Sequence, residues 1–213
     1  FRAPTLNERF DPSYGNPDLE AEEAQGYEVG ADVWFAAFGQ DRGIELGALY
    51  RSTDVDNLIS YASTPPYGFI NIAEAELESA EARVAIRPLS WLTGQVSYVY
   101  TDATNGVTGA RLARRPEEAW AASLTAEHGA LKAQLTWRHV GEQLDRIYSD
   151  TGLFTGAGDL PAFETLRASV GWEFAEGREV FVAGANLTDE VYEIPGGFAG
   201  APASFLVGIR VRP

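Results

Sequence analysis

Apolar and polar residues alternate along much of this chain, most regularly at its end, from Ala203 to Pro213. In that stretch the apolar positions are Phe205, Val207, Ile209 and Val211, and the positions between them include Ser204, Gly208, Arg210 and Arg212. A period of two predicts a β-strand with one apolar and one wet face. A strand with arginines on one face and branched aliphatic residues on the other is suited to separate lipid from water.

The same alternation recurs upstream and predicts about nine strands, most of roughly ten residues or more. These strands are expected around residues 26–35, 44–51, 80–87, 92–100, 120–125, 131–138, 166–174, 181–187 and 203–213. Residues 1–6 are expected to form the top of a further strand that runs into a loop over residues 7–25.

The breaks between the predicted strands alternate in length. Short breaks fall near residues 41, 89, 128 and 176, the first predicted as a tight turn over residues 39–43, and long ones near 15, 65, 105, 150 and 195. Short turns on one side and long loops on the other are typical of an outer-membrane barrel. We therefore predict an all-β fold, an antiparallel transmembrane β-barrel. A soluble β-sandwich is the alternative, because alternating strands also build sandwiches.

Composition narrows the class of protein further. The 31 acidic and 16 basic residues give a formal charge of −15, which argues against nucleic acid as a partner. Cysteine is absent, which excludes disulfides and thiolate metal sites. The sequence contains no run of eighteen or more apolar residues, so it predicts no transmembrane helix. Bacterial single-chain barrels have an even number of strands, so about nine cannot close alone, and we expect further strands before Phe1.

Four segments resemble one known family. Phe1 to Glu8 reads FRAPTLNE and Gly15 to Glu22 reads GNPDLEAE, followed by the pair Tyr27-Glu28. The other segments are LARRP at 112–116, NLTDEVY at 186–192 and GIRVR at 208–212. Together they resemble the C-terminal part of TonB-dependent outer-membrane receptors, most closely the vitamin B12 (cobalamin) receptor branch. The family pattern ends in an aromatic residue, where this chain has Pro213.

The resemblance implies that residues 1–213 are the C-terminal portion of a 22-stranded barrel whose plug domain and first strands lie outside this sequence. It implies a receptor in the bacterial outer membrane that actively takes up a scarce nutrient, with cobalamin as the first candidate and a ferric siderophore or haem as the alternative. The implied partners are outer-membrane lipid, a small-molecule ligand, and the TonB–ExbB–ExbD complex, contacted through the absent N-terminal segment. A passive pore without a plug is the rival function.

Candidate site residues fall in the predicted outer loops. The aromatic side chains there are suited to gripping an amphiphilic ligand or to packing the loops: Tyr61, Tyr67, Phe69, Tyr148 and Phe154. Three loop aspartates, Asp145, Asp150 and Asp159, are weak candidates for Ca²⁺ ligands. No other cofactor is expected.

Charged residues on the predicted inner face are interpreted either as contacts to a plug or ligand, or as a ladder of opposite charges. They are Glu28, Asp32, Glu45, Arg51, Glu81, Arg83, Arg87, Arg138, Arg167, Glu173, Arg210 and Arg212. No enzyme is expected, because the chain has no Gly-x-Ser-x-Gly motif and only two histidines, His128 and His139.

Overall fold

A computed structural model describes residues 1–62 and 65–212 of the chain. Ser63, Thr64 and Pro213 lie outside the described residues, and with them part of the break predicted near residue 65 and the terminal position where the family has an aromatic. Among the described residues, no helix is long and apolar enough to cross a membrane.

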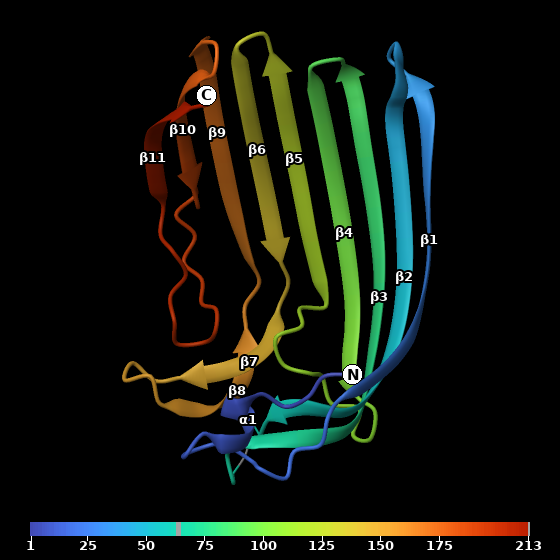
Figure 1. The fold of residues 1–213 in the computed structure, drawn as a ribbon, viewed down its shortest axis with the longest axis vertical. Helices are drawn as coiled ribbons and strands as arrows, with labels where there is room; N and C mark the ends of the chain where they lie inside the picture. The colour runs from blue at the N-terminus through green and yellow to red at the C-terminus, as the bar shows by residue number, and fades with distance from the viewer. Residues whose placement is uncertain (63–64, 213) are drawn as a thin grey trace.

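The described residues form one curved sheet of nine antiparallel strands (Figure 1). Their order in the sheet is β1-β2-β3-β4-β5-β6-β9-β10-β11. The strands are β1 (Glu23–Ala37), β2 (Gln40–Tyr61), β3 (Phe69–Leu89), β4 (Leu92–Asn105), β5 (Glu118–His128), β6 (Leu131–Val140), β9 (Phe163–Ala175), β10 (Arg178–Ala185) and β11 (Ser204–Val211). The number of predicted strands is confirmed, and within the described residues the sheet is open between β1 and β11.

Short turns and long loops lie at opposite ends of the sheet, as predicted (Figure 1). At the upper end of the view, β1 and β2 are joined by Phe38 and Gly39, both with positive φ (56° and 73°). Two such residues form the hairpin turn whose twist matches the flanking strands. The tight turn predicted over 39–43 is therefore too long, because residues 40–43 already lie within β2.

The chain is less regular at the loop end than the sequence predicted. Residues 1–6 do not form a strand: Arg2 makes one isolated bridge to Glu22, and a short helix, α1 (Leu6–Phe10), follows. The longest break contains a separate hairpin of β7 (Gln143–Tyr148) and β8 (Phe154–Leu160). Strands β10 and β11 have eight residues each, fewer than the ten expected. The five-residue helix and the six- and seven-residue strands of the hairpin show too few repeats for a period to be read reliably.

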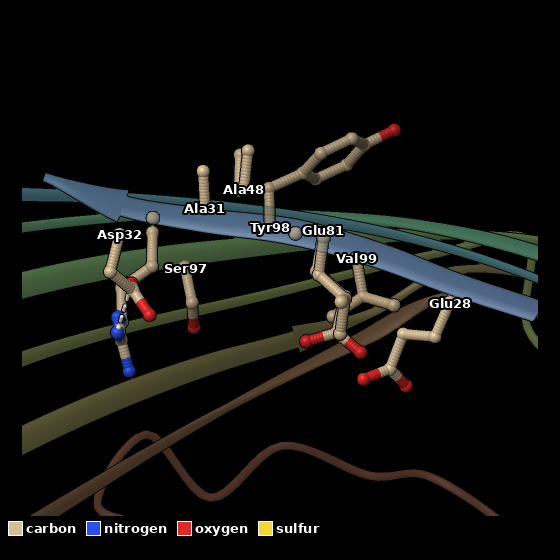
Figure 2. Close-up of a pocket in the computed structure, with 13 residues that line it drawn as sticks. Glu28, Ala31, Asp32, Ala48, Glu81, Ser97, Tyr98 and Val99 are labelled. Carbon is tan, nitrogen blue, oxygen red and sulfur yellow. Dashed lines mark hydrogen bonds and ion pairs between the residues drawn. The ribbon is translucent and has the colours of Figure 1, made fainter.

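The two faces of the sheet carry the side chains that the alternation assigned to them. Figure 2 shows Glu28, Asp32, Glu81 and Ser97 on one side of the ribbon and Ala31, Ala48 and Tyr98 on the other. The first side is the inner, concave one, where the remaining strands of the sheet lie in that view.

Aromatic residues on the outer face gather at two levels. Tyr98 and Trp120 pack with ring centroids 4.3 Å apart toward the loop end, and Trp172 and Phe174 lie 6.1 Å apart near the turn end. Aromatic girdles flank the apolar band of outer-membrane barrels in this way. Beyond Tyr50, outward positions on β2 and its partner β3 become acidic, as in the register pair Asp54↔Glu76, so the apolar band ends there.

Candidate functional site

All five predicted aromatic residues meet in one cluster at the loop end of the sheet. Tyr61, on β2, contacts Phe69 and Phe154 edge-on, with ring centroids 5.5 Å away in both cases. Phe154 in turn contacts Tyr67 at 5.1 Å and Tyr148 at 5.8 Å. Edge-to-face pairs at these separations are favourable contacts. The β2–β3 loop and the β7–β8 hairpin are therefore joined by aromatic packing.

Three further residues extend this aromatic cluster, and the sequence did not single them out. Tyr14 packs edge-on against Tyr61 at 5.6 Å, and Phe198 packs against Tyr148 at 5.3 Å. The guanidinium of Arg146 lies 4.6 Å from the centre of the Tyr61 ring, a cation–π distance. These residues come from segments far apart in the sequence, and no local pattern relates them.

Exposure differs among the cluster members. Tyr67 is 41% exposed, while Tyr61, Phe69, Tyr148 and Phe154 are half-buried. Burial raises the pKa of the Tyr61 hydroxyl above its ordinary value. Tyr61 therefore packs within the cluster, while the ring of Tyr67 is accessible to solvent.

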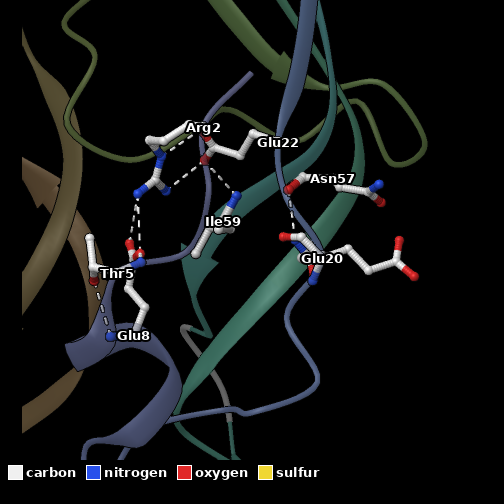
Figure 3. Close-up of polar contacts among 8 residues, drawn as sticks. Arg2, Thr5, Glu8, Glu20, Glu22, Asn57 and Ile59 are labelled. Carbon is white, nitrogen blue, oxygen red and sulfur yellow. Dashed lines mark hydrogen bonds and ion pairs between the residues drawn. The ribbon is translucent and has the colours of Figure 1, made fainter.

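The first resembling segment folds into a clasp of ion pairs and caps, which we call the N-terminal clasp (residues 1–22) (Figure 3). Arg2 binds Glu22 through Nε and one terminal nitrogen, both at 2.7 Å, and binds Glu8 at 3.1 Å. Glu8 also accepts a hydrogen bond from the backbone N–H of Thr5, whose hydroxyl caps α1 in return.

Several hydrogen bonds fasten the clasp to the neighbouring strands, among them one between the backbone N–H of Phe69 and the carbonyl of Tyr14. Glu22 accepts a hydrogen bond from the backbone N–H of Ile59 on β2 at 2.8 Å. Asn71 on β3 bonds the backbone of Glu20 in both directions, and its amide also donates to the carbonyl of Asn57. The hydrogen bonds from Arg2 hold the pKa of Glu22 below its ordinary value. The N-terminal clasp is therefore held against β2 and β3 by these hydrogen bonds.

The LARRP segment connects the β4–β5 loop to the β7–β8 hairpin. Leu112 is buried beside Ala75 and Ala103. Arg114 donates from Nε to Oδ1 of Asp145 at 2.7 Å, and its backbone N–H donates to the carbonyl of Leu144. Asp145 has no exposed surface, although the residue was predicted only as a weak Ca²⁺ candidate.

The three candidate calcium aspartates do not converge. Asp145 is buried against Arg114, Asp159 pairs with Arg111 at 2.8 Å, and Asp150 is exposed beside the tip of the hairpin. Asp145 and Asp159 occupy adjacent register positions, opposite Gly158 and Leu144, so they point to opposite faces of the hairpin. Ca²⁺ binding by these residues stays a prediction.

Arg115 faces a hollow on the inner wall below the loops. This hollow has a volume of about 470 Å³, and its lining also includes the basic residues Arg51 and Arg114 and the acidic residues Glu78 and Glu81. The Nε of Arg115 is buried and has no hydrogen-bond partner among residues 1–62 and 65–212. It is a cationic donor that the sequence analysis did not single out within the LARRP segment.

Opposite charges pair between strands on much of the inner wall, either across neighbouring strands or, for Asp32 on β1 and Arg83 on β3, over Gly47 of the strand between them. The pairs are Glu28–Arg51 at 2.9 Å, Asp32–Arg83 at 2.7 Å, Glu45–Arg87 at 2.8 Å and Glu179–Arg210 at 3.0 Å. The hollow in Figure 2, of about 490 Å³, lies among the first two of them. The predicted ladder of opposite charges is confirmed for the first three pairs, and Arg210 pairs with Glu179, which was not among the predicted residues.

The NLTDEVY segment ends β10 with a buried turn. Asn186 is 4% exposed and has a positive φ of 49°. Its amide nitrogen donates to the carbonyls of Glu190 and Ala201, and its oxygen accepts from the N–H of Glu190. Tyr192 stacks on Phe163 with centroids 4.4 Å apart. This segment therefore shapes the last loop.

Comparison with known proteins identifies the family. A family model described as "TonB dependent receptor-like, beta-barrel" matches residues 1–187. The chain belongs to this family. Its members are receptors and transporters of the outer membrane, so the barrel prediction and the outer-membrane localisation are confirmed, and the soluble sandwich is wrong.

Curated relatives carry the name "Vitamin B12 transporter BtuB". The protein of Vibrio cholerae serotype O1 is 25% identical over 213 residues, which covers 98% of this chain and 33% of the relative. The protein of Photobacterium profundum is 29% identical over 146 residues, 65% of this chain and 23% of the relative. The chain thus spans about a third of the length of the first of these relatives.

Solved structures share the fold at lower identity. The structure titled "Copper transporter OprC" superposes with a TM-score of 0.76 at 16% identity, over 99% of this chain and 35% of that one. The ferripyoverdine receptor of the Pseudomonas aeruginosa outer membrane, bound to ferripyoverdine, gives a TM-score of 0.69 at 16% identity, over 91% of this chain and 27% of that one.

Proposed function

We propose that this chain is the C-terminal barrel portion of a TonB-dependent outer-membrane transporter that takes up cobalamin. Family membership supports the class of transporter. The relatives named as vitamin B12 transporters, at 25% and 29% identity, support the ligand.

The observation that carries a ligand site is the aromatic cluster at the loop end. Tyr67 offers an exposed ring on a scaffold that Tyr61 and Phe154 hold in place. Arg115, whose Nε is buried without a partner among the described residues, lies on the inner wall beneath the loops. An amphiphilic ligand with an anionic group, such as the phosphodiester of cobalamin, finds a stacking surface and a charge-assisted donor there.

A ferric siderophore is the second candidate, because the ferripyoverdine receptor shares this fold. Binding of either ligand changes the receptor only through its differential affinity for two states, so no covalent chemistry is required and no enzyme activity is proposed. We further propose that energy comes through the TonB–ExbB–ExbD complex, contacted by a segment outside these residues.

The test is nutrient-limited growth. The gene for the full protein is deleted, and growth is compared on limiting cobalamin and on limiting iron, with the intact gene restored as a control. Failure on cobalamin alone supports the proposal, and failure on iron alone favours the siderophore. Uptake that continues after TonB is removed contradicts both and favours a passive pore.

A further inference from the structure

Two arginines on the inner wall lack the carboxylate partners that other arginines on this wall have. Arg138 on β6 and Arg167 on β9 project from the same face as Thr136 and Ser169. Neither makes an ion pair or a side-chain hydrogen bond with any residue in the described ranges 1–62 and 65–212, as the contacts of the inner wall show. By contrast, Arg51, Arg83, Arg87 and Arg210 each bind a glutamate or aspartate.

The register places these two arginines at neighbouring positions. Arg138 pairs with Thr165, and Arg167 pairs with Thr136, so the two arginines are diagonal neighbours on adjacent strands. Diagonal neighbours on one face of a sheet are about 7–8 Å apart, within reach of long side chains. Two like charges at this separation disfavour each other unless an anion lies between them.

The surroundings of the pair carry no acidic group within the part of the chain that the structure describes. Strand β6 has β9 on one side and β5 on the other, and on β5 the residue paired with Arg138 is Ala121. A hollow of about 530 Å³ at this place is lined by both arginines and by the polar side chains of Gln134, Thr136, Ser169 and Ser204. The positive site is a local feature, since the whole chain has a formal charge of −15.

We propose that Arg138 and Arg167 form an oxyanion-binding site on the inner wall of the barrel, which takes a carboxylate or phosphate group. Guanidinium groups bind such groups through charge-assisted and often paired hydrogen bonds, and the neighbouring hydroxyl and amide groups supply further donors. The oxyanion comes either from a small solute inside the barrel or from an acidic side chain of the same protein enclosed by it. The site does not depend on which nutrient is transported.

The experiment titrates the full-length receptor in detergent with inorganic phosphate at constant ionic strength. Wild-type protein is compared with the double variant R138Q/R167Q and with R210Q, a matched control whose arginine already pairs with Glu179. If the source is a solute, phosphate binds wild type and R210Q alike. Its affinity then falls at least tenfold in R138Q/R167Q, because each charge-assisted hydrogen bond contributes a factor of about 10 to 100.

A second measurement covers an oxyanion that the protein itself supplies. In that case phosphate does not bind wild type. Thermal unfolding of the full-length receptor then tells the two double variants apart. The charge reversal R138E/R167E lowers the midpoint temperature of unfolding more than R138Q/R167Q does. The proposal is overturned if wild type binds no phosphate and the two double variants unfold at the same temperature. It is also overturned if R138Q/R167Q binds phosphate as tightly as wild type, which would make the bound phosphate an adventitious ion only.

Discussion

Glu22 joins three parts of the chain through one carboxylate. Its two oxygens accept hydrogen bonds from Arg2 at 2.7 Å, and one of them also accepts from the N–H of Ile59. The side chain of Glu22 is 13% exposed and that of Arg2 is 42% exposed, so the pair is screened only in part. The role of the N-terminal clasp therefore depends on the charge of this glutamate.

Replacing Glu22 with Gln is expected to loosen the clasp by about 1–2 kcal/mol, less than a fully buried charged contact because Arg2 is half exposed. Amide hydrogen exchange of residues 1–22 in the full-length receptor measures this opening. Glu23→Gln is the matched control, since Glu23 is the adjacent glutamate and its side chain is exposed at the start of β1. Equal exchange in the two variants would contradict the structural role of Glu22.

The same carboxylate predicts an acid dependence of the clasp. Hydrogen bonds from Arg2 lower the pKa of Glu22 in the folded protein. The stabilisation is thus complete above the unfolded value of about 4.3 and is lost as the pH falls through the lower folded pKa. A spin label at Ser13→Cys, in the clasp, is expected to become mobile in wild type only at a pH below the unfolded value of about 4.3. In E22Q it should already be mobile at neutral pH and change less on acidification.

Two of the tyrosines in the aromatic cluster, Tyr61 and Tyr67, are expected to differ in their effects. Tyr67→Ala removes an exposed ring and should weaken ligand binding by about 0.5–1.5 kcal/mol, roughly two- to tenfold. It removes the contact to Phe154 as well and should loosen the loops less than Tyr61→Ala does. Tyr61→Ala removes contacts to Tyr14, Phe69 and Phe154 and should increase proteolysis of the loops as well. Ligand titration and limited proteolysis of the full-length receptor separate the two. Unchanged affinity in Tyr67→Ala would exclude this ring from the ligand site.

At the scale of elements, the β7–β8 hairpin is held by contacts of unequal burial. Asp145, without exposed surface, binds Arg114, while Asp159, with a side chain 62% exposed, binds Arg111. A backbone bridge from Ile147 to Gly196 adds a link to the β10–β11 loop. The hairpin thus connects the loops that surround it.

Asp145→Asn is expected to destabilise the hairpin by about 1–3 kcal/mol, because it removes the charge that binds Arg114 and the amide must fit the same buried place. Asp159→Asn breaks an exposed pair and should cost less than about 1 kcal/mol. Hydrogen exchange of residues 143–160 compares them directly. A larger opening of the hairpin in Asp159→Asn than in Asp145→Asn would contradict the greater role of the buried pair.

At the scale of the whole molecule, the sheet separates lipid from the barrel interior. Leu124 and Thr125 are neighbours on β5, yet Leu124 pairs with Gly94 and Leu135 on the outer face, and Thr125 faces inward. The apolar side chains thus form a single layer on the outer face. Of two neighbouring residues, Leu124 faces the lipid and Thr125 faces the water inside the barrel.

Leu124→Arg is therefore expected to reduce insertion into the outer membrane, since an arginine on the lipid face near the midplane costs about 2–4 kcal/mol. Thr125→Arg places the same side chain on the wet face and should insert nearly as well as wild type. The folded fraction is measured by heat-dependent mobility on denaturing gels. Equal loss in both variants would contradict the assignment of the two faces.

Much of the fold was predictable because a period of two depends only on neighbouring residues. The nine strands, their two faces and the alternation of turns and loops all follow from that period. The β7–β8 hairpin was missed because its strands are short and are held by contacts to distant residues, such as Arg114 for Asp145. The helix α1 was missed because five residues show no period, although its capping box of Thr5 and Glu8 is a local signal in the sequence.

The candidate site was predictable only as a set of residue types. The sequence by itself determined which side chains face lipid and which face the interior, since that follows from the order of residues along each strand. Only the tertiary structure decided that five loop aromatics share one cluster, and that Arg51 has a carboxylate partner while Arg138 has none among the described residues. Those outcomes depend on which strands lie side by side and in which register, and contacts between residues distant in sequence leave no periodic signal.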